Sequence, residues 1–132
     1  MSPLVSILIP VFNRSSLIGK TIQSALDQTY QNIEVIVVDN ASTDNTWEIV
    51  QQYAELDNRV KVFRNKSNLG PVRNWLKCIE AATGEYGKIL WSDDLICPSF
   101  VEETLNFFNE DIGFVYTAVN VISEEGYKKG VI

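Results

Sequence analysis

The stretch IEVIVVDNASTDNT, residues 33–46, decides the fold, because an apolar run is followed at once by polar residues that can start a helix. The run ends at Asp39 and consists mostly of Ile and Val, which is typical of a strand buried on both faces. Ser42, Thr43 and Asp44 are capping residues, and apolar residues at helical spacing follow them. We therefore expect a strand, a loop and a helix.

The same order occurs at the start of the chain. The run LVSILIP, residues 4–10, predicts another buried strand that Pro10 closes. Polar residues 13–16 offer caps, and apolar residues then recur at helical spacing as far as Gln28. Two consecutive strand-helix units of this length favour a parallel sheet.

Two further strands fit this pattern. A third strand over residues 60–63 leads to Pro71, which suits the first position of a helix that we expect to end at Gly84. A fourth strand is expected at about residues 86–91. Alternation of strands and helices predicts an α/β fold, with a mostly parallel open sheet and helices on both faces, as in Rossmann-like domains.

The last third of the chain is less regular. Pro98 can open a helix through Phe108, residues 113–122 predict a further strand, and Glu125-Gly126 resembles a hairpin turn. The final YKKGVI completes no element that we can assign. We expect a single domain over residues 1–132 that is a fragment of a longer protein.

Composition excludes several classes of chemistry. The 132 residues contain no histidine, so Ser-His, Cys-His and His-based acid-base catalysis are excluded. Cys78 and Cys97 lie far apart without histidine, and we interpret both as reduced and structural. A net charge of −6 and the lack of a basic stripe disfavour nucleic acid partners.

The sequence also gives an expectation about location. It has no apolar run of membrane-spanning length, and its first residues lack the features of a signal peptide. We expect a cytoplasmic protein without a membrane span. If the protein associates with the cytoplasmic face of a membrane, we expect parts outside this chain to mediate the association.

Three polar clusters follow predicted strands, at residues 10–14, 39–44 and 92–94. Ligands of open parallel sheets bind outside the carboxyl ends of the strands, so these clusters are expected to converge. Asp39 stands where a nucleotide-binding fold commonly contacts a ribose hydroxyl or a base edge. The alternative is that Asp39 only caps the following turn.

The loop after the first strand narrows the kind of nucleotide site. VFNRSS, residues 11–16, contains no glycine, which disfavours a dinucleotide fingerprint, and no Gly-Lys-Ser or Gly-Lys-Thr of a P-loop occurs. A diphosphate then needs another source of positive charge. Asp93 and Asp94 could hold a divalent cation there, or they could be ordinary turn residues. Arg73 could add charge, or be a solvated residue of its helix.

Four stretches in a fixed order resemble the family 2 glycosyltransferases, whose N-terminal nucleotide-sugar-binding domain has the GT-A fold. They are VSILIPVFNR (5–14), SALDQTYQNIEVIVVDNASTDNT (24–46), NLGPVRNW (68–75) and ATGEYGKILWSDD (82–94). Each motif alone is modestly specific, but the ordered set is strong. The resemblance implies an inverting transfer of a sugar from a nucleoside-diphosphate sugar to an acceptor hydroxyl.

The resemblance also implies roles for individual residues. Those that match nucleotide-sugar-binding positions are Pro10, Phe12, Asn13, Asp39, Asn40 and Arg73, with Asp44 in the same motif as Asn40. Asp39 matches the carboxylate that contacts the nucleoside base. Asp93 matches the last acidic residue of the Asp-x-Asp metal motif, which implies Mn²⁺ or Mg²⁺ as cofactor, with Asp94 as a helper.

The chain departs from the family pattern at two places. Trp91 replaces the first aspartate of the metal motif, and it could equally be a core residue at the end of its strand. The family's catalytic base and most acceptor contacts lie in a later segment, so we assign no base within residues 1–132 and expect it beyond Ile132. The acceptor class stays open between glycans, as in polysaccharide biosynthesis, lipid-linked acceptors and proteins. A non-catalytic nucleotide-sugar-binding module that has lost its metal site is the alternative function.

Overall fold

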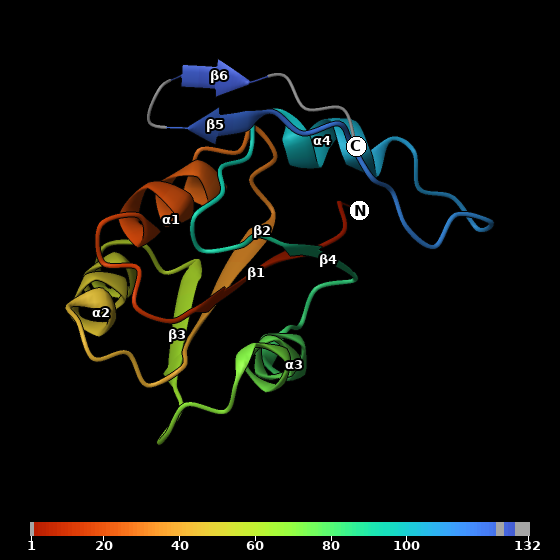
Figure 1. Cartoon of the computed structure of the whole chain (residues 1–132). Coiled ribbons are helices and arrows are strands. Elements are labelled where there is room, and N and C mark those ends of the chain that lie inside the picture. The colour runs from red at the N-terminus through yellow and green to blue at the C-terminus, as the bar shows by residue number, and fades with distance from the viewer. Residues whose placement is uncertain (1, 124–125, 129–132) are drawn as a thin grey trace. The chain divides into compact units, whose positions relative to one another are not determined.

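The computed structural model describes residues 2–123 and 126–128 and divides the chain into two compact units, Met1–Glu102 and Glu103–Ile132. The first unit contains a four-stranded parallel sheet with the strand order β3-β2-β1-β4. Its strands are β1 (Val5–Val11), β2 (Ile33–Asp39), β3 (Val60–Arg64) and β4 (Tyr86–Ile89) (Figure 1). The predicted α/β fold with a parallel sheet is confirmed.

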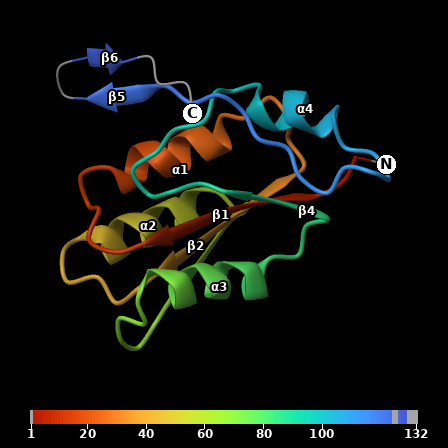
Figure 2. The same ribbon diagram turned by 45° about the vertical axis from the view of Figure 1, so that its right-hand side comes forward.

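Three helices connect these strands, and they cover both faces of the sheet. They are α1 (Ile18–Leu26), α2 (Thr46–Leu56) and α3 (Pro71–Ala81). Figure 2 shows α1 and α2 on one side of the sheet and α3 on the other. Every residue of β1 and β2 is buried, as expected of central strands covered on both faces.

The core beneath α3 shows how the sheet and helix pack. Leu8, Ile36, Val38 and Cys78 form a buried cluster. Cys78 and Cys97 are both free, but Cys97 is exposed, so only Cys78 has the structural role that we predicted for both. Burial raises the pKa of the Cys78 thiol to about 12. The cysteine therefore acts as a small apolar residue here.

The helix ends differ in part from the predicted ones. Residues 13–16 do not cap α1, whose N-cap is Leu17 without a side-chain hydrogen bond. Pro71 opens α3 as predicted, but that helix ends at Ala81 and not at Gly84. A Cβ atom at Gly84 would lie 2.6 Å from Ser6 Oγ and 2.7 Å from the carbonyl oxygen of Leu4. Glycine is therefore required at this position for close packing against β1, not for ending the helix.

The end of the chain is less regular than predicted. The helix α4 covers Phe100–Leu105 only, and the strand expected over 113–122 is reduced to β5 (Val121–Ser123). Residues 113–120 pair with no strand among the described residues and are mostly exposed. They therefore form no strand, because strand propensity alone is weak without pairing and burial. β5 pairs with β6 (Gly126–Lys128) in an antiparallel hairpin, and the predicted turn residue Glu125 lies outside the described residues.

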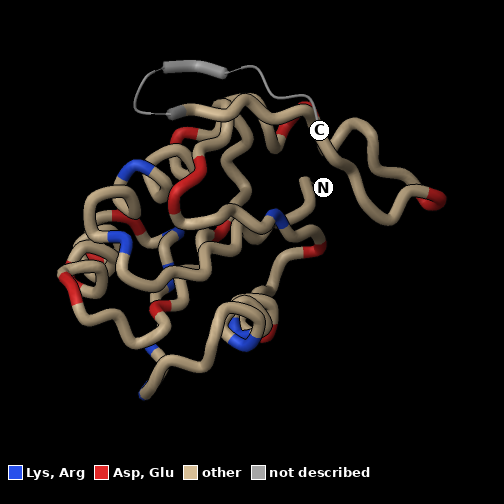
Figure 3. The backbone as a smooth tube through the Cα atoms, viewed as in Figure 1, with Lys and Arg blue, Asp and Glu red and all other residues tan. Residues whose placement is uncertain are grey.

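Two global properties complete the description. No helix in the described part of the chain is long and apolar enough to cross a membrane. Acidic and basic residues are interspersed over the first unit (Figure 3), so neither sign of charge is gathered in one of its segments.

Candidate functional site

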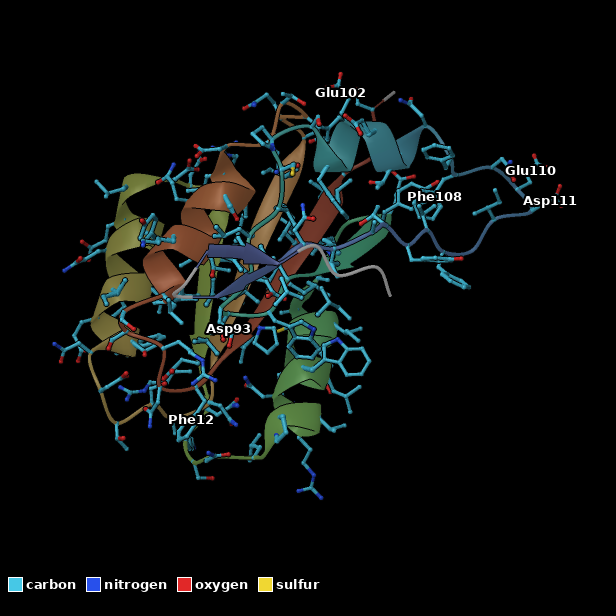
Figure 4. All side chains as sticks on the ribbon, turned by 45° about the horizontal axis from the view of Figure 1, so that its top comes forward. Phe12, Asp93, Glu102, Phe108, Glu110 and Asp111 are labelled. Atoms are coloured by element: carbon cyan, nitrogen blue, oxygen red, sulfur yellow. The ribbon has the colours of Figure 1, made fainter. Side chains whose placement is uncertain are left out.

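The carboxyl ends of β1, β2 and β4 lie at the same edge of the sheet. Val11 at the end of β1 pairs with Asp39 at the end of β2, and β4 runs parallel on the other side of β1. Figure 4 shows Phe12 and Asp93 on the loops that leave this edge. Pro10 is buried within β1, whereas the Phe12 side chain is 38% exposed. The polar clusters predicted to converge therefore do so.

The loop after β1 is fastened to the loop after β2. The Asn13 backbone N–H donates to Ser42 Oγ over 2.9 Å, and Asn13 Oδ1 accepts from the Thr43 backbone N–H over 2.8 Å. Asn13 has a positive φ of 51°, a conformation that asparagine tolerates better than most residues. Asn13 is thus a structural junction at the edge of the sheet as well as a predicted binding residue.

Asp44 is a second link between the loop after β1 and the loop after β2. Its Oδ1 accepts from the Thr46 backbone N–H at the start of α2, and its Oδ2 accepts from the Ser15 backbone N–H. Burial alone would raise the pKa of Asp44, but the hydrogen bonds from Thr46 and Ser15 lower it to about 2. Asp44 is therefore charged at neutral pH. It is not the N-cap that we predicted, because the N-cap of α2 is Asn45 without a side-chain hydrogen bond, but its carboxylate still accepts from the first backbone N–H of the helix.

Asp39 is fully buried at the end of β2. Its Oδ2 lies 3.1 Å from Arg64 Nε, and both carboxylate oxygens accept from the Ser42 backbone N–H. The Arg64 guanidinium also donates to the Ser42 carbonyl oxygen and lies over the ring of Trp47. Asp39 caps the following turn, as the alternative interpretation of this residue stated. Its carboxylate also forms an ion pair with Arg64.

Asn40 organises the neighbouring loop. Its Nδ2 donates to Asn68 Oδ1 over 2.9 Å, and its Oδ1 accepts from Asn65 Nδ2 and from the Leu69 backbone N–H. Its backbone N–H donates to the Val11 carbonyl oxygen. Asn40 therefore fixes the segment between β3 and α3 to the ends of β1 and β2.

The predicted metal residues lie in the turn after β4. Asp93 and Asp94 are exposed, and Asp93 Oδ2 lies 3.3 Å from Arg14 Nε. Trp91 is 49% exposed, so the alternative that it is a core residue is wrong. The described residues contain no group of three or more Cys, Asp or Glu side chains that could hold a metal ion by themselves. Asp93 and Asp94 fit a cation shared with the phosphates of a ligand, because Mg²⁺-type sites often have only one or two protein carboxylates.

Arg73 is the predicted site residue with the fewest interactions among the residues that the structure describes. It is exposed in the first turn of α3 and forms no ion pair with any residue that the structure describes. Its predicted contact with the diphosphate stays a prediction.

The sequence interpretation missed two arginines, Arg14 and Arg64. Arg14 could have been found, because it lies in the cluster of residues 10–14 that was predicted to converge with residues 92–94, although its partner Asp93 is 79 residues away. Arg64 gave no such signal, because it lies just after the predicted strand 60–63 and the register that places it opposite Asp39 is set by the tertiary structure.

Comparison with known proteins places these features in context. The family model described as Glycosyl transferase family 2 matches residues 6–131. An uncharacterized glycosyltransferase of Haemophilus influenzae is 42% identical over 105 residues, which are 80% of this chain and 42% of that protein. The putative teichuronic acid biosynthesis glycosyltransferase TuaG of Bacillus subtilis is 36% identical over 125 residues, which are 94% of this chain and 50% of that protein. The chain thus spans half or less of the length of these relatives.

Solved structures agree with the sequence relatives. The crystal structure of S. aureus TarS 1-349 in complex with UDP has a TM-score of 0.72 at 30% identity, covering 78% of this chain and 31% of that one. The mannosyltransferase PcManGT from Pyrobaculum calidifontis, in complex with GDP-Man and Mn²⁺, has a TM-score of 0.77 at 25% identity. That match covers 84% of this chain and 34% of PcManGT.

Proposed function

The chain belongs to glycosyl transferase family 2 and has the GT-A fold, and from this premise we propose that residues 1–132 are the donor-binding domain of a longer, inverting glycosyltransferase. The parent enzyme transfers a sugar, a hexose or a related one, from a nucleoside diphosphate to an acceptor hydroxyl. The greater length of the relatives supports the assignment to part of a longer protein.

The observation that carries this proposal is the meeting of the loops after β1, β2 and β4 at one edge of the sheet. Asn13 bonds to the loop after β2, and Asp93 pairs with the residue next to Asn13 in the chain. In open parallel sheets this edge is where nucleotides bind. The TarS and PcManGT structures, which contain UDP and GDP-Man, support a nucleoside-diphosphate sugar as the ligand.

Each site residue has a proposed role in binding the donor. The half-exposed ring of Phe12 is available to pack against the nucleoside, with Pro10 and Asn13 shaping the loop. Asp39 contacts the base once an oxygen is released from Ser42, and Asn40 holds the loop beside it. Arg73 contributes positive charge near the nucleotide. These roles follow from the family motif and from the position of the residues at the sheet edge.

A divalent cation, Mn²⁺ or Mg²⁺, is the proposed cofactor, with Asp93 as its main ligand and Asp94 as a helper. When bound, it supplies positive charge to the diphosphate as negative charge grows on the leaving group. The PcManGT structure with Mn²⁺ supports this proposal. The chain's own residues orient the donor so that its anomeric carbon can be attacked in line.

The acceptor side of the reaction is proposed to reside outside this chain. The catalytic base and most acceptor contacts are expected beyond Ile132, so the 132-residue chain binds donor but transfers sugar poorly. We propose a cytoplasmic enzyme acting in polysaccharide biosynthesis, with lipid-linked and protein acceptors as the competing possibilities. The teichuronic acid relative supports the polysaccharide assignment.

A second function is favoured by two local features. Trp91 takes the place of an acidic residue, and Asp93 is already paired with Arg14. Both features also suit a module that binds a nucleotide sugar without metal and without transfer.

Calorimetric titration distinguishes the two functions. The chain is titrated with UDP and with GDP, each with and without Mn²⁺, in the wild type and in Asp93→Asn. The donor-binding domain predicts that Mn²⁺ strengthens nucleotide binding and that Asp93→Asn abolishes this gain. Asp27→Asn, an exposed aspartate of α1's C-cap, is the matched control and should behave as the wild type. Nucleotide binding that ignores both Mn²⁺ and Asp93→Asn would favour the metal-free module, and no binding of either nucleotide would refute both.

A further inference from the structure

Arg14 contacts the segments that follow three of the four strands at the carboxyl edge, namely β1, β2 and β4. It lies in the loop after β1, its backbone N–H donates to Thr46 Oγ1 over 2.8 Å, and its Nε lies 3.3 Å from Asp93 Oδ2 after β4. Its carbonyl oxygen accepts from the backbone N–H groups of Leu17 and Ile18 at the start of α1. The backbone of Arg14 is therefore fixed on both sides, and only its side chain can change partner.

The ion pair between Arg14 and Asp93 is exposed and replaceable. The two side chains are 44% and 45% exposed, and ion pairs of this kind are weak because water screens them. A divalent cation bound to Asp93 would need the same carboxylate and would repel the guanidinium beside it. Without another ligand, Arg14 therefore competes with the cation for Asp93.

The Arg14 guanidinium has capacity for a second anion. Its Nη1 donates to the Asn13 carbonyl oxygen, and its Nη2 has no hydrogen-bond partner among residues 2–123 and 126–128. A guanidinium presents a planar fork of donors that matches phosphate oxygens. A diphosphate at this edge carries more charge than one carboxylate and is the stronger partner for Arg14.

We propose that Arg14 is a positioning residue that couples cation binding to nucleotide binding. Without nucleotide its guanidinium neutralises Asp93 and weakens cation binding, and with nucleotide it moves to the diphosphate and leaves Asp93 to the cation. This inference rests on the proposed donor site, and it predicts that the cation and the nucleotide increase each other's affinity by the same factor.

The test is calorimetry on the 132-residue chain with Mn²⁺ alone, with UDP or GDP alone, and with both. In Arg14→Gln, we expect Mn²⁺ alone to bind about fivefold tighter and nucleotide with Mn²⁺ to bind about tenfold weaker, in the usual range of site coupling. Arg14→Lys keeps the charge but loses the fork, so its affinity for Mn²⁺ alone should stay close to that of the wild type. Thermal melting of both variants checks that they fold.

Lys77→Gln is the matched control, because Lys77 also forms an exposed ion pair, with Glu80, and its loss changes the net charge equally. It should leave both affinities unchanged. If Arg14→Gln binds Mn²⁺ alone no tighter than Lys77→Gln does, the coupling inference is wrong while the donor site stands. If the wild type binds neither nucleotide in the presence of Mn²⁺, the proposed function fails, and the inference fails with it.

Discussion

Asp39 and Arg64 form an ion pair in which the Asp39 side chain is completely buried while the Arg64 side chain is 40% exposed. The two residues end neighbouring strands and are directly opposite in the parallel register. Arg64 also lies over Trp47, so its position is fixed by packing as well as by charge. The negative charge of Asp39, at the centre of the proposed nucleotide site, is therefore neutralised by an arginine of the neighbouring strand.

Replacing Arg64 by glutamine leaves the buried Asp39 carboxylate without its cation. We expect a loss of about 2 kcal/mol in the free energy of unfolding, below the range for fully buried pairs because water reaches the guanidinium. Urea denaturation measures it. Arg73→Gln is the control, since Arg73 is exposed and forms no ion pair with described residues. Equal stability of the two variants would contradict the role of Arg64.

Replacing Asn40 by alanine removes the side-chain bonds to Asn65, Asn68 and Leu69. We expect a loss of about 2 to 3 kcal/mol in the free energy of unfolding, because the buried Asn40 side chain is lost and the half-buried Asn65 and Leu69 lose a hydrogen bond together. Faster hydrogen exchange of the Leu69 amide would show that the loop before α3 has loosened. Unchanged exchange at Leu69 would refute the organising role of Asn40. The exposed Asn58→Ala serves as a control that should change neither quantity.

Glu34 gives the stability a specific dependence on acid. Burial raises the pKa of this carboxyl, but hydrogen bonds from Lys61, Ser6 and Thr83 outweigh it and lower the pKa from 4.5 to about 2. A carboxyl whose pKa is lower in the folded state than in the unfolded state stabilises the fold at any pH above its unfolded-state pKa. This stabilisation is lost as the pH falls to the folded-state pKa. The shift corresponds to about 3 kcal/mol, lost between about pH 4.5 and pH 2.

Urea denaturation between about pH 7 and pH 2.5 measures this contribution. Glu34→Gln should be less stable than the wild type at neutral pH and should lose less stability on acidification, since it has no carboxyl to protonate at this position. Parallel pH profiles of the two proteins would show that Glu34 is not responsible.

Gly84→Ala tests the packing of the α3–β4 connection on β1. The new Cβ atom would lie 2.8 Å or less from two backbone atoms, the Leu4 carbonyl oxygen and the Ser6 nitrogen, which cannot move without distorting β1. We expect a loss of about 2 kcal/mol in the free energy of unfolding, typical of overpacking. Gly87→Ala is the matched control, because its nearest atom is Leu8 Cδ1 at 3.8 Å, an ordinary contact. Both variants are compared by thermal melting, and similar melting temperatures would contradict the prediction.

Much of the site could be predicted because it depends on the order of strands along the chain. Once residues 33–39 are a buried parallel strand, Asp39 must stand at its carboxyl end beside the loop after β1. The structure confirms that convergence. It corrects three interpretations that rested on single residues: Trp91 is exposed and not a core residue, Gly84 is a packing residue and not a helix end, and Cys97 is exposed and not structural.

The sequence by itself determined the fold class, the order of its elements and the edge of the sheet at which the polar clusters meet and where we propose that the ligand binds. These properties depend on local periodicity and on turn residues, which act over a few neighbouring positions. Only the tertiary structure decided that Arg14 pairs with Asp93 and that Arg64 balances Asp39. Such pairs depend on strand order and register, which bring together side chains as far as 79 positions apart and leave no periodic trace in the sequence.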